Sequence, residues 1–468
     1  MGSTSGRRVG AGSPTTSPRD AGRRNRRCTV RVRSLTLLLV LALAAATVGG
    51  IPGAGAQAAG PRAAKGPAGA APGGEVPAGL AAGAAIPGRW IVRFADGTDP
   101  SEAVARLARR AGPLAGRPVR AVYTKVLRGA AATMSAADAA RLAGHPEVVA
   151  VEPDRVVSLA ETSSTAAASA AAAQVDPPWG LDRIDTRCTS RSTCTARYDR
   201  RYRYSSAGGQ VIAYVLDTGI RASHREFRTA SGTTSRVLAQ VNTTLDGRDH
   251  DCNGHGTHVA GTIGGRTFGV AKNVRFRIAK VLDCTGRGSY TSVIAGLDWV
   301  RAQHRPGTRA VLNLSLGGPP SDSLDAAVRA VIAAGITVVV ASGNSGADAC
   351  VVSPARVTQA ITVNAAERWD KDASFSNGGP CTDLHAPGVG IPSAWHTSDT
   401  AQAWKSGTSM AAPHVAGCVA RLLGAQPTLG PGAVQSTIKA RTSTGVLTFP
   451  YGHLSGTPNR LLYCRPDW

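Results

Sequence analysis

The sequence predicts an α/β protein of three layers, in which helices cover both faces of a mostly parallel sheet, and a small α+β unit ahead of it. Two observations support this prediction. From about residue 175 onward, short runs of Val, Ile, Leu and Ala alternate with amphipathic helical segments, a pattern typical of parallel sheets buried on both faces. Between residues 87 and 159, the strand and helix signals follow the order β-α-β-β-α-β.

The strong positive charge of the chain does not indicate a nucleic-acid partner. The 468 residues carry a formal net charge of +23, and a chain of this length is expected to hold more than one unit. However, no run of Lys and Arg lies within the large folded part, and no stacking aromatic residues accompany one. We therefore expect a solvated basic surface and no nucleic-acid binding.

The first 56 residues have the order of a secretory signal peptide. The Arg-rich "RRNRRCTVRVR" precedes the apolar run "LTLLLVLALAAATVGGI", and the small residues "AGA" follow at Ala54–Ala56. The strongly apolar part is only about fifteen residues long, below the roughly twenty that span a bilayer. We expect residues 1–56 to be removed and the protein to be secreted, without stable membrane association. Residues 57–86, rich in Ala, Gly and Pro, are expected to be a linker.

The cysteine count agrees with an extracellular location. Of the nine cysteines, Cys28 lies in the expected signal peptide, and the other eight all follow residue 180. An even number in an oxidising compartment suits disulfides.

The small unit can be followed element by element. "RWIVRF" alternates as a strand, and "DPSEAVARLARRAG" is a helix that starts at Asp-Pro-Ser. "AVYTKVLRGAAATM" has strand alternation, "SAADAARLAGHP" is a second capped helix, and "VVAVEPDRVV" is a last strand. This is a ferredoxin-like unit over residues 87–159. The Ala- and Ser-rich residues 160–174 are expected to be an exposed, cleavable connection.

The large unit is expected over residues 175–468. Its expected strands include "QVIAYVLD", "VRFRIAKVLD", "RAVLNLSLG", "ITVVVASG" and "AITVNAA". Its expected helices include "GHGTHVAGTIGG", "SVIAGLDWVRAQ", "SLDAAVRAVIAAG" and "SMAAPHVAGCVARLLGAQP". Ligands of such sheets bind at the carboxyl ends of the strands, so the polar residues that follow the strands are the candidates for chemistry.

Three such positions carry an acid, a histidine and a serine. Asp217 ends the strand of "VLDTGI", His255 opens the helix of "NGHGTH", and Ser409 opens the helix of "SGTSMAAPHVAG". Taken alone, Asp217 could cap a turn and Ser409 could be an ordinary N-cap. Together the three residue types are the orienter, base and nucleophile of acyl transfer.

The stretch "DHDCNGHGTHVAG" offers an alternative interpretation. His250, Cys252, His255 and His258 lie within nine residues, and such a cluster could bind zinc. The residues of this stretch leave that alternative open.

The motifs resemble a known family. "VLDTGI", "HGTHVAG" and "GTSMAAPHVAG", in the order Asp, His, Ser, are similar to those of the subtilisin family of serine proteases (peptidase S8), and the order is that of subtilisin itself. "PWGLDRID", "VLNLSLGG", "ASGNSGADAC" and "SFSNGGPCTDLHAPG" resemble the proteinase K and aqualysin-like branch, and "HPEVVAVEPDRVV" resembles an I9-type inhibitory propeptide. The likeness covers about residues 174–464 and implies a subtilisin-like fold.

The resemblance implies roles for four residues. Ser409 would be the nucleophile, His255 the general base, and Asp217 the group that orients the imidazole. The side-chain amide of Asn344, with the backbone N–H of Ser409, would stabilise the oxyanion. A secreted serine endopeptidase of broad specificity is thus implied. An esterase would normally show G-x-S-x-G, whereas this serine lies in "SGTSMA". A non-catalytic protein on this scaffold would be favoured only if one of the four residues were replaced.

The resemblance also implies how substrate binds. A protein or peptide substrate would add a strand between two edges, which are formed by Gly286, Gly288, Ser315, Leu316 and Gly317. Tyr290 would line the pocket for the fourth residue before the cut, and Ala341 and Gly343 would line a roomy primary pocket for apolar or aromatic residues. The protein's own propeptide would inhibit a monomeric enzyme, and self-cleavage is expected near Ala173.

Calcium and disulfides complete the expectations from the resemblance. A structural Ca²⁺ would bind Asp383 and the backbone oxygens of Thr358 and Ala360. Asp182 and Asp185 would either form a second site or lie in a surface loop. The resemblance pairs Cys252 with Cys284 and Cys350 with Cys381, which argues against zinc at Cys252. Proximity suggests Cys188 with Cys194, leaving Cys418 with Cys464, although spacing alone does not fix these two pairs.

Overall fold

The computed structural model describes residues 76–109, 112–161, 174–192, 194, 198–244 and 246–468. The expected signal peptide and most of the two expected linkers therefore lie outside the described residues. In the part of the chain that is described, no helix combines the length and the apolar character needed to cross a bilayer.

A small unit opens the described chain and has the expected order β-α-β-β-α-β. Its elements are β1 (Ala85–Phe94), α1 (Pro100–Leu107), β2 (Val119–Tyr123), β3 (Gly129–Thr133), α2 (Ala136–Ala143) and β4 (Val148–Leu159). The central strand β1 pairs antiparallel with β3 on one side and with β4 on the other. Because β1 begins at Ala85, it includes the last two residues of the segment expected to be linker.

Both helices of the small unit start at side-chain caps. The carboxylate of Asp99 accepts the backbone N–H of Glu102 at 2.9 Å, and the hydroxyl of Ser135 accepts that of Asp138 at 3.1 Å. These bonds satisfy backbone donors that a helix leaves free in its first turn. The capping residues read from the sequence thus set the start of each helix.

The larger part of the described chain surrounds a second sheet, in which ten strands are described. Its order is β17-β18-β14-β12-β11-β9-β5-β7-β6, with β13 beside β12, and the pairs from β14 to β6 are parallel. The strands are β5 (Ile212–Asp217), β6 (Val237–Asn242), β7 (Arg275–Lys280), β9 (Ala310–Leu314), β11 (Thr337–Ala341), β12 (Ile361–Glu367), β13 (Lys371–Asp372), β14 (Leu384–Pro387), β17 (Ser443–Thr444) and β18 (Arg460–Leu461).

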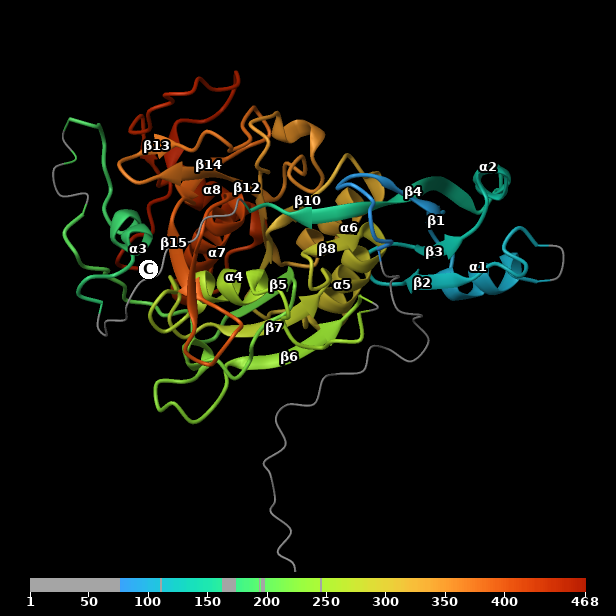
Figure 1. Cartoon of the computed structure of the whole chain (residues 1–468), viewed down its shortest axis with the longest axis horizontal. Coiled ribbons are helices and arrows are strands. Elements are labelled where there is room, and N and C mark those ends of the chain that lie inside the picture. The colour runs from blue at the N-terminus through green and yellow to red at the C-terminus, as the bar shows by residue number, and fades with distance from the viewer. Residues whose placement is uncertain (1–75, 110–111, 162–173, 193, 195–197, 245) are drawn as a thin grey trace, which may run out of the picture. The chain divides into compact units, whose positions relative to one another are not determined.

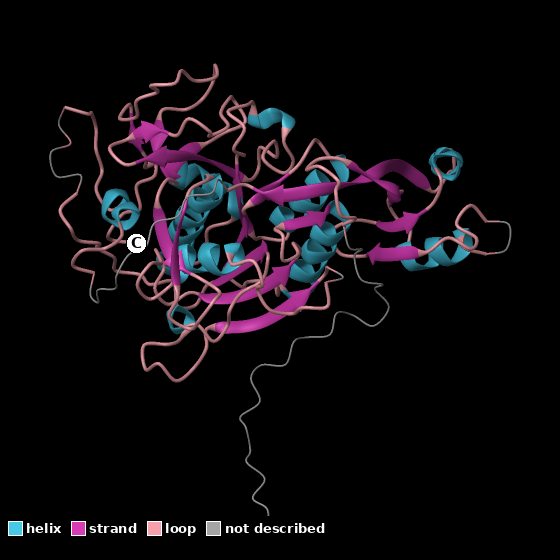
Figure 2. Ribbon diagram, in the orientation of Figure 1, coloured by secondary structure: helices cyan, strands magenta, loops and turns pink. Residues whose placement is uncertain are grey.

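Helices pack on both faces of this sheet (Figures 1 and 2). They are α4 (His255–Gly264), α5 (Tyr290–Gln303), α6 (Asp322–Ala333), α7 (Thr408–Ala425) and α8 (Pro431–Ala440). The connections hold the remaining elements, which are α3 (Trp179–Ile184), the 3-10 helices η1 (Arg225–Phe227) and η2 (Ala349–Val351), and the hairpin of β15 (Ile391–Ala394) and β16 (Gln402–Lys405). Along β5, Ala213 and Val215 pack with residues of α4, α7 and α8, whereas Tyr214 and Leu216 pack with residues of α5 and α6. Successive side chains of a strand point to opposite faces, so the expected three layers are present.

The last strand of the small unit joins the two parts of the chain. β4 pairs antiparallel with β8 (Arg287–Ser289) and with β10 (Leu316–Gly317) (Figure 1). Ser158 is opposite Arg287 on one side and Gly317 on the other. The end of β4 therefore lies as a middle strand between two edges of the larger unit, where the sequence led us to expect substrate.

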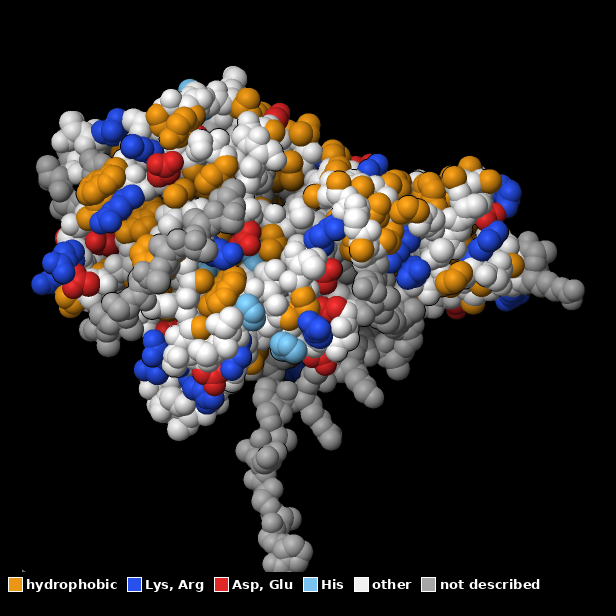
Figure 3. Space-filling view, viewed as in Figure 1, with side chains coloured by type: hydrophobic (Ala, Val, Ile, Leu, Met, Phe, Trp, Pro, Cys, Tyr) orange, Lys and Arg blue, Asp and Glu red, His pale blue; other side chains and the backbone are white. Residues whose placement is uncertain are grey.

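The basic residues are dispersed on the face of the molecule drawn in Figure 3. Lys and Arg side chains lie there among acidic and uncharged ones, over several elements. On this face the positive charge is not collected into a single patch.

Candidate active site

The proposed acid, base and nucleophile lie on three elements that pack against one another, β5, α4 and α7. Asp217 is the last residue of β5, His255 is the first residue of α4, and Ser409 lies in the first turn of α7. All three residues are fully buried. Residues far apart in the sequence thus lie at the ends of neighbouring elements, one at the end of a strand and two at the start of helices.

Asp217 and His255 form a direct hydrogen bond. His255 Nδ1 lies 2.7 Å from Asp217 Oδ1, and the backbone N–H of Thr218 donates to the same oxygen at 2.7 Å. Burial alone would lower the pKa of His255, but the negative charge of Asp217 and this hydrogen bond outweigh burial and raise the pKa above its usual value. The pair is therefore suited to stabilise a positive imidazolium.

Ser409 contacts the end of the small unit. Its backbone N–H donates to the carbonyl oxygen of Ala160 at 3.0 Å, and its hydroxyl donates to the carbonyl of Ser315 at 3.0 Å. His255 Nε2 is buried and has no hydrogen-bond partner among the described residues. The serine hydroxyl is thus held by a backbone carbonyl in this state, and the ring nitrogen that would accept its proton is free.

Asn344, in the loop after β11, is held by the start of α7. Its side-chain oxygen accepts the backbone N–H of Thr408 at 2.9 Å and the Thr408 hydroxyl at 2.8 Å. These bonds leave Asn344 Nδ2 buried and without a partner in the described part of the chain. A Cβ atom at Gly407 would lie 2.5 Å from Ala160 O and 3.1 Å from Asn344 Nδ2. Gly407 therefore leaves room where the carbonyl and the free amide converge.

Sequence reasoning missed Asp251, which positions two parts of this site. Its buried carboxylate accepts the hydroxyls of Thr218 and Thr257 at 2.9 and 2.6 Å, and also three backbone N–H groups. Burial opposes ionisation, but these hydrogen bonds hold the pKa of Asp251 below its usual value. The Thr218 hydroxyl in turn accepts the N–H of Gly256 at 2.9 Å. Asp251 thus ties the residue after Asp217 to the helix of His255.

The residues predicted to bind substrate as an added strand lie along the two edges that hold β4. Gly288 lies in β8, and Gly286 is the residue directly before this strand. Leu316 and Gly317 form β10, which Ser315 directly precedes. Main-chain pairing of this kind is how a peptide adds to a sheet edge, and in this structure residues 156–159 of β4 occupy the position.

The residues predicted to line pockets lie near the same strand. Tyr290 is buried at the start of α5, shares a cluster with Val157, and donates its hydroxyl to the carbonyl of Pro319. Ala341 ends β11 and shares a buried cluster with Ala160. The N–H of Gly343 donates to the Thr408 hydroxyl at 3.2 Å. These placements agree with an apolar environment around residues 157 and 160.

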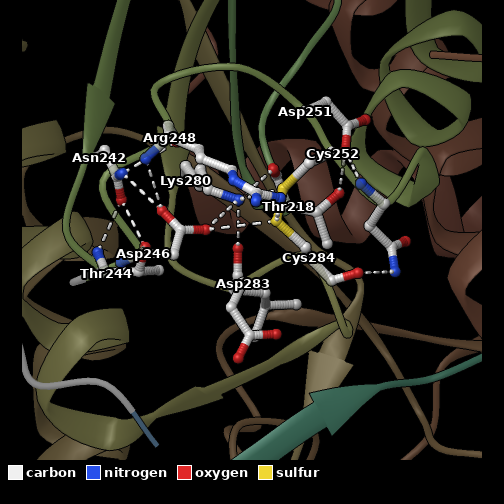
Figure 4. A network of polar contacts seen from close by, with 12 residues as sticks. Thr218, Asn242, Thr244, Asp246, Arg248, Asp251, Cys252, Lys280, Asp283 and Cys284 are labelled. Atoms are coloured by element: carbon white, nitrogen blue, oxygen red, sulfur yellow. Dashed lines mark hydrogen bonds and ion pairs between the residues drawn. A yellow bond between two sulfur atoms is a disulfide. The ribbon is translucent and has the colours of Figure 1, made fainter. Parts of the chain in front are cut away.

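Four disulfides are found among the described residues, and they join the cysteines in the predicted pairs: Cys188–Cys194, Cys252–Cys284, Cys350–Cys381 and Cys418–Cys464. The pair Cys252–Cys284 ties the loop before His255 to the segment before β8 (Figure 4). Beside it, the fully buried Lys280 contacts Asp246 Oδ2 at 2.9 Å and the carbonyl of Thr218 at 3.1 Å. This network joins the loop before His255 to the segment before β8.

The same contacts decide against zinc in the histidine-rich stretch. Cys252 is bonded to Cys284, and His255 Nδ1 contacts Asp217. His258 Nε2 lies 2.9 Å from the carbonyl of Ile391, and burial lowers the pKa of His258 to about 3. The one group of potential ligand atoms within the described ranges, Asp246, Cys252 and Cys284, has its two sulfurs joined in the disulfide.

The oxygens predicted to bind calcium have other partners, so this prediction is not supported. Lys439 Nζ contacts Asp383 Oδ1 at 2.5 Å, and the backbone N–H of Thr362 donates to Asp383 Oδ2 at 2.9 Å. Gln435 Nε2 donates to the carbonyl oxygens of Thr358 and Ala360, both at 2.9 Å. An ammonium group and an amide N–H cannot ligate a cation, and the residues therefore do not fit Ca²⁺ as they stand.

Asp182 and Asp185 do not lie in the exposed surface loop that was one of the two expectations. The two side chains are buried rather than exposed in a surface loop. Asp182 accepts the backbone N–H groups of Asp199 and Arg200, both at 3.1 Å, and Asp185 accepts that of Arg203 at 2.8 Å. Burial raises the pKa of Asp185 to about 6. The two carboxylates fasten the segment 199–203.

Comparisons with known proteins agree with the geometry. The family model described as "Subtilase family" matches residues 208–453, and that described as "Peptidase inhibitor I9" matches residues 91–160. The chain is 46% identical over 402 residues to an extracellular serine proteinase of Thermus sp. (strain Rt41A), covering 82% of this chain and 91% of that protein. It is 37% identical over 390 residues to proteinase R of Parengyodontium album, covering 82% and 90%.

A solved structure is similar as well. The crystal structure of a cold adapted subtilisin-like serine proteinase matches with a TM-score of 0.55 and 43% identity, over 62% of this chain and 98% of that one. The resemblance seen in the motifs and the predicted fold class are thereby confirmed. The chain belongs to the subtilase family of serine endopeptidases and carries a peptidase inhibitor I9 segment ahead of its catalytic part.

Proposed function

We propose that the protein is a secreted serine endopeptidase of broad specificity that is made as a zymogen and cleaves itself. The observation that carries the proposal is the carbonyl of Ala160, which accepts the N–H of Ser409 at 3.0 Å. Gly407 faces both this carbonyl oxygen and the unpartnered side-chain amide of Asn344. A peptide carbonyl lying against the proposed nucleophile and its proposed oxyanion donors supports this function.

The proposed reaction follows from these contacts. Ser409 Oγ attacks the carbonyl carbon while its proton passes to His255 Nε2, which has no other partner among the residues described. Asp217 fixes the ring with its proton on Nδ1 and stabilises the imidazolium. The C–N bond then breaks as His255 returns the proton to the leaving amine, leaving an ester on Ser409. Water attacks this ester while His255 takes its proton, and the bond to Ser409 Oγ breaks as His255 returns the proton to Oγ.

The oxyanion is stabilised by two donors in this proposal. The N–H of Ser409 already contacts a carbonyl oxygen, and Asn344 Nδ2 is held nearby through its own side-chain oxygen. Because Nδ2 has no hydrogen-bond partner among the described residues, it is free to donate to the oxygen as that oxygen becomes negative. Such donors act mainly on the transition state.

Replacement of Asn344 by alanine is expected to lower kcat by about 10²–10³-fold with KM nearly unchanged, a magnitude known from subtilisin itself. Steady-state hydrolysis of a peptide anilide measures both constants. Thr408→Val is the control, because it removes the hydroxyl that bonds Asn344 Oδ1 and Gly343 N–H but keeps the Thr408 N–H and the Asn344 amide, and it should lower kcat less than about tenfold. Equal losses in both variants would assign Asn344 a structural role only.

The bond proposed for self-cleavage is Ala160–Glu161. The expected cut near Ala173 lies outside the described residues, whereas Ala160 is the residue whose carbonyl lies at Ser409. Leu159, Ser158 and Val157 precede it as a strand paired with β8 and β10. The strand occupies both proposed substrate edges, β8 and β10. This supports inhibition by the protein's own propeptide.

An acidic residue at position 160 is expected to slow this cleavage by at least about 100-fold. Ala160 shares a buried apolar cluster with Ala341 and Met410, and an unpaired carboxylate placed there is costly to desolvate. Intact mass of the purified zymogen followed over time gives the rate for Ala160→Asp. Ala173→Asp is the control and should be cleaved like the parent, whose first large product should begin at Glu161. A first product that begins at Gln174 would contradict this proposal.

A further inference from the structure

The predicted calcium ligands are held by two side chains of one helix. Gln435 and Lys439 both belong to α8 and are four residues apart, so they lie on the same face. On the core side of that helix, Val434 and Ile438 are buried in the cluster that covers the sheet. The packing of these two apolar residues therefore fixes the rotation of α8 and directs Gln435 and Lys439 toward the oxygens.

Gln435 and Lys439 together provide one hydrogen-bond donor or positive charge for each of the three oxygens. Thr358 O and Ala360 O are carbonyls, which only accept hydrogen bonds, and Gln435 presents its amide nitrogen to both at 2.9 Å. Asp383 carries the negative charge, and Lys439 Nζ meets its Oδ1 at 2.5 Å, with side-chain exposures of 35% and 10%. A partly buried ammonium thus lies against the carboxylate, where a divalent cation would otherwise be attracted.

We infer that Lys439 and Gln435 take the place of a structural calcium ion at this position and keep the ion out. The ammonium supplies the positive charge for Asp383, and the amide supplies the donors for the two carbonyls. The three oxygens lie in the loop before β12 and in the residue before β14, so the two side chains join these segments to α8. A free Ca²⁺ would have to displace a tethered cation and would meet its repulsion.

The replacement of calcium by Lys439 and Gln435 does not depend on the proposed reaction. It can therefore be tested on the full chain in a Ser409→Ala background, where self-digestion does not disturb unfolding or binding measurements. Three comparisons are needed: calcium bound by the parent and by Asp383→Asn, thermal unfolding of Lys439→Ala, and calcium bound by the double variant Lys439→Ala/Gln435→Ala.

Calorimetric titration with CaCl₂ should give the same number of bound ions for the parent and for Asp383→Asn. The double variant should bind one ion more than the parent, because the oxygens are released from both donors. A parent that loses one bound ion on Asp383→Asn would overturn the inference. So would a double variant that binds no additional calcium, since these two side chains would then not be what excludes it.

Thermal unfolding in EDTA provides an independent comparison. Lys439→Ala should lower the Tm by roughly 2–6 °C, because Asp383 loses its counter-charge. Lys371→Ala, at an exposed lysine of β13, removes an equal charge elsewhere and should change the Tm by less than about 1 °C. Adding calcium should restore the Tm of the double variant toward that of the parent. Equal shifts for Lys439→Ala and Lys371→Ala would contradict the proposed contact.

Discussion

Replacement of Ser409 by alanine is expected to leave the Ala160–Glu161 bond uncut and to lower peptide hydrolysis by about a million-fold, the magnitude found for the triad of subtilisin itself. The substitution removes the proposed nucleophile but keeps the backbone N–H that binds Ala160 O. The small unit should therefore stay in place and covalently joined. Intact mass after purification and hydrolysis of casein measure the two effects.

Ser345→Ala provides the control for this variant. Ser345 is an exposed serine next to Asn344, and its removal should leave self-cleavage and hydrolysis within about twofold of the parent. A Ser409→Ala protein that still cuts its Ala160–Glu161 bond at the rate of the parent would refute the proposed role of Ser409, and with it the proposed mechanism.

Replacement of Asp217 by asparagine should lower kcat by about 10⁴-fold, as it does in serine proteases with the same triad. An amide would present N–H to His255 Nδ1 and favour the tautomer that cannot accept the serine proton. The pH profile should change too. His255 must be neutral to act as a base, and its pKa is raised by Asp217 against the effect of burial. Without that charge the pKa falls, so the acid limb of kcat/KM should move to lower pH.

Kinetics of the mature enzyme between pH 5 and 9 test this shift. Asp249→Asn, at an exposed carboxylate before the same helix, is the matched control and should leave the acid limb in place. An acid limb at the same pH in the parent and in Asp217→Asn would mean that Asp217 does not set the protonation of the base.

The sequence was sufficient where a signal is local or tied to a motif. Asp99 and Ser135 mark helix starts, and the alternation of apolar runs predicts the parallel sheet. Asp217, His255 and Ser409 could be proposed from the sequence because each ends or opens an element with a characteristic motif. The contact of His255 with Asp217 joins the start of a helix to the end of a strand, at the edge of the sheet where such proteins bind their ligands.

The sequence was insufficient where a contact joins distant segments without a motif. The last strand was predicted to end near Val157, but pairing with β8 and β10 extends β4 to Leu159 and brings Ala160 to Ser409. The Ala- and Ser-rich composition of residues 160–174 led instead to the prediction of self-cleavage near Ala173. Lys439 was overlooked for the same reason, because its carboxylate partner lies 56 positions earlier and only the rotation of α8 brings them together.

The shared sheet of β4, β8 and β10 has a consequence for the kinetic order of activation. Ala160 and Ser409 belong to one chain and are already in contact, so the proposed cut is a unimolecular event whose half-time does not change with dilution. A substrate in solution must instead compete with a strand whose effective concentration is set by its tether. A single molecule released far from any other copy would therefore still cleave itself, and no activating protease is needed for that first step.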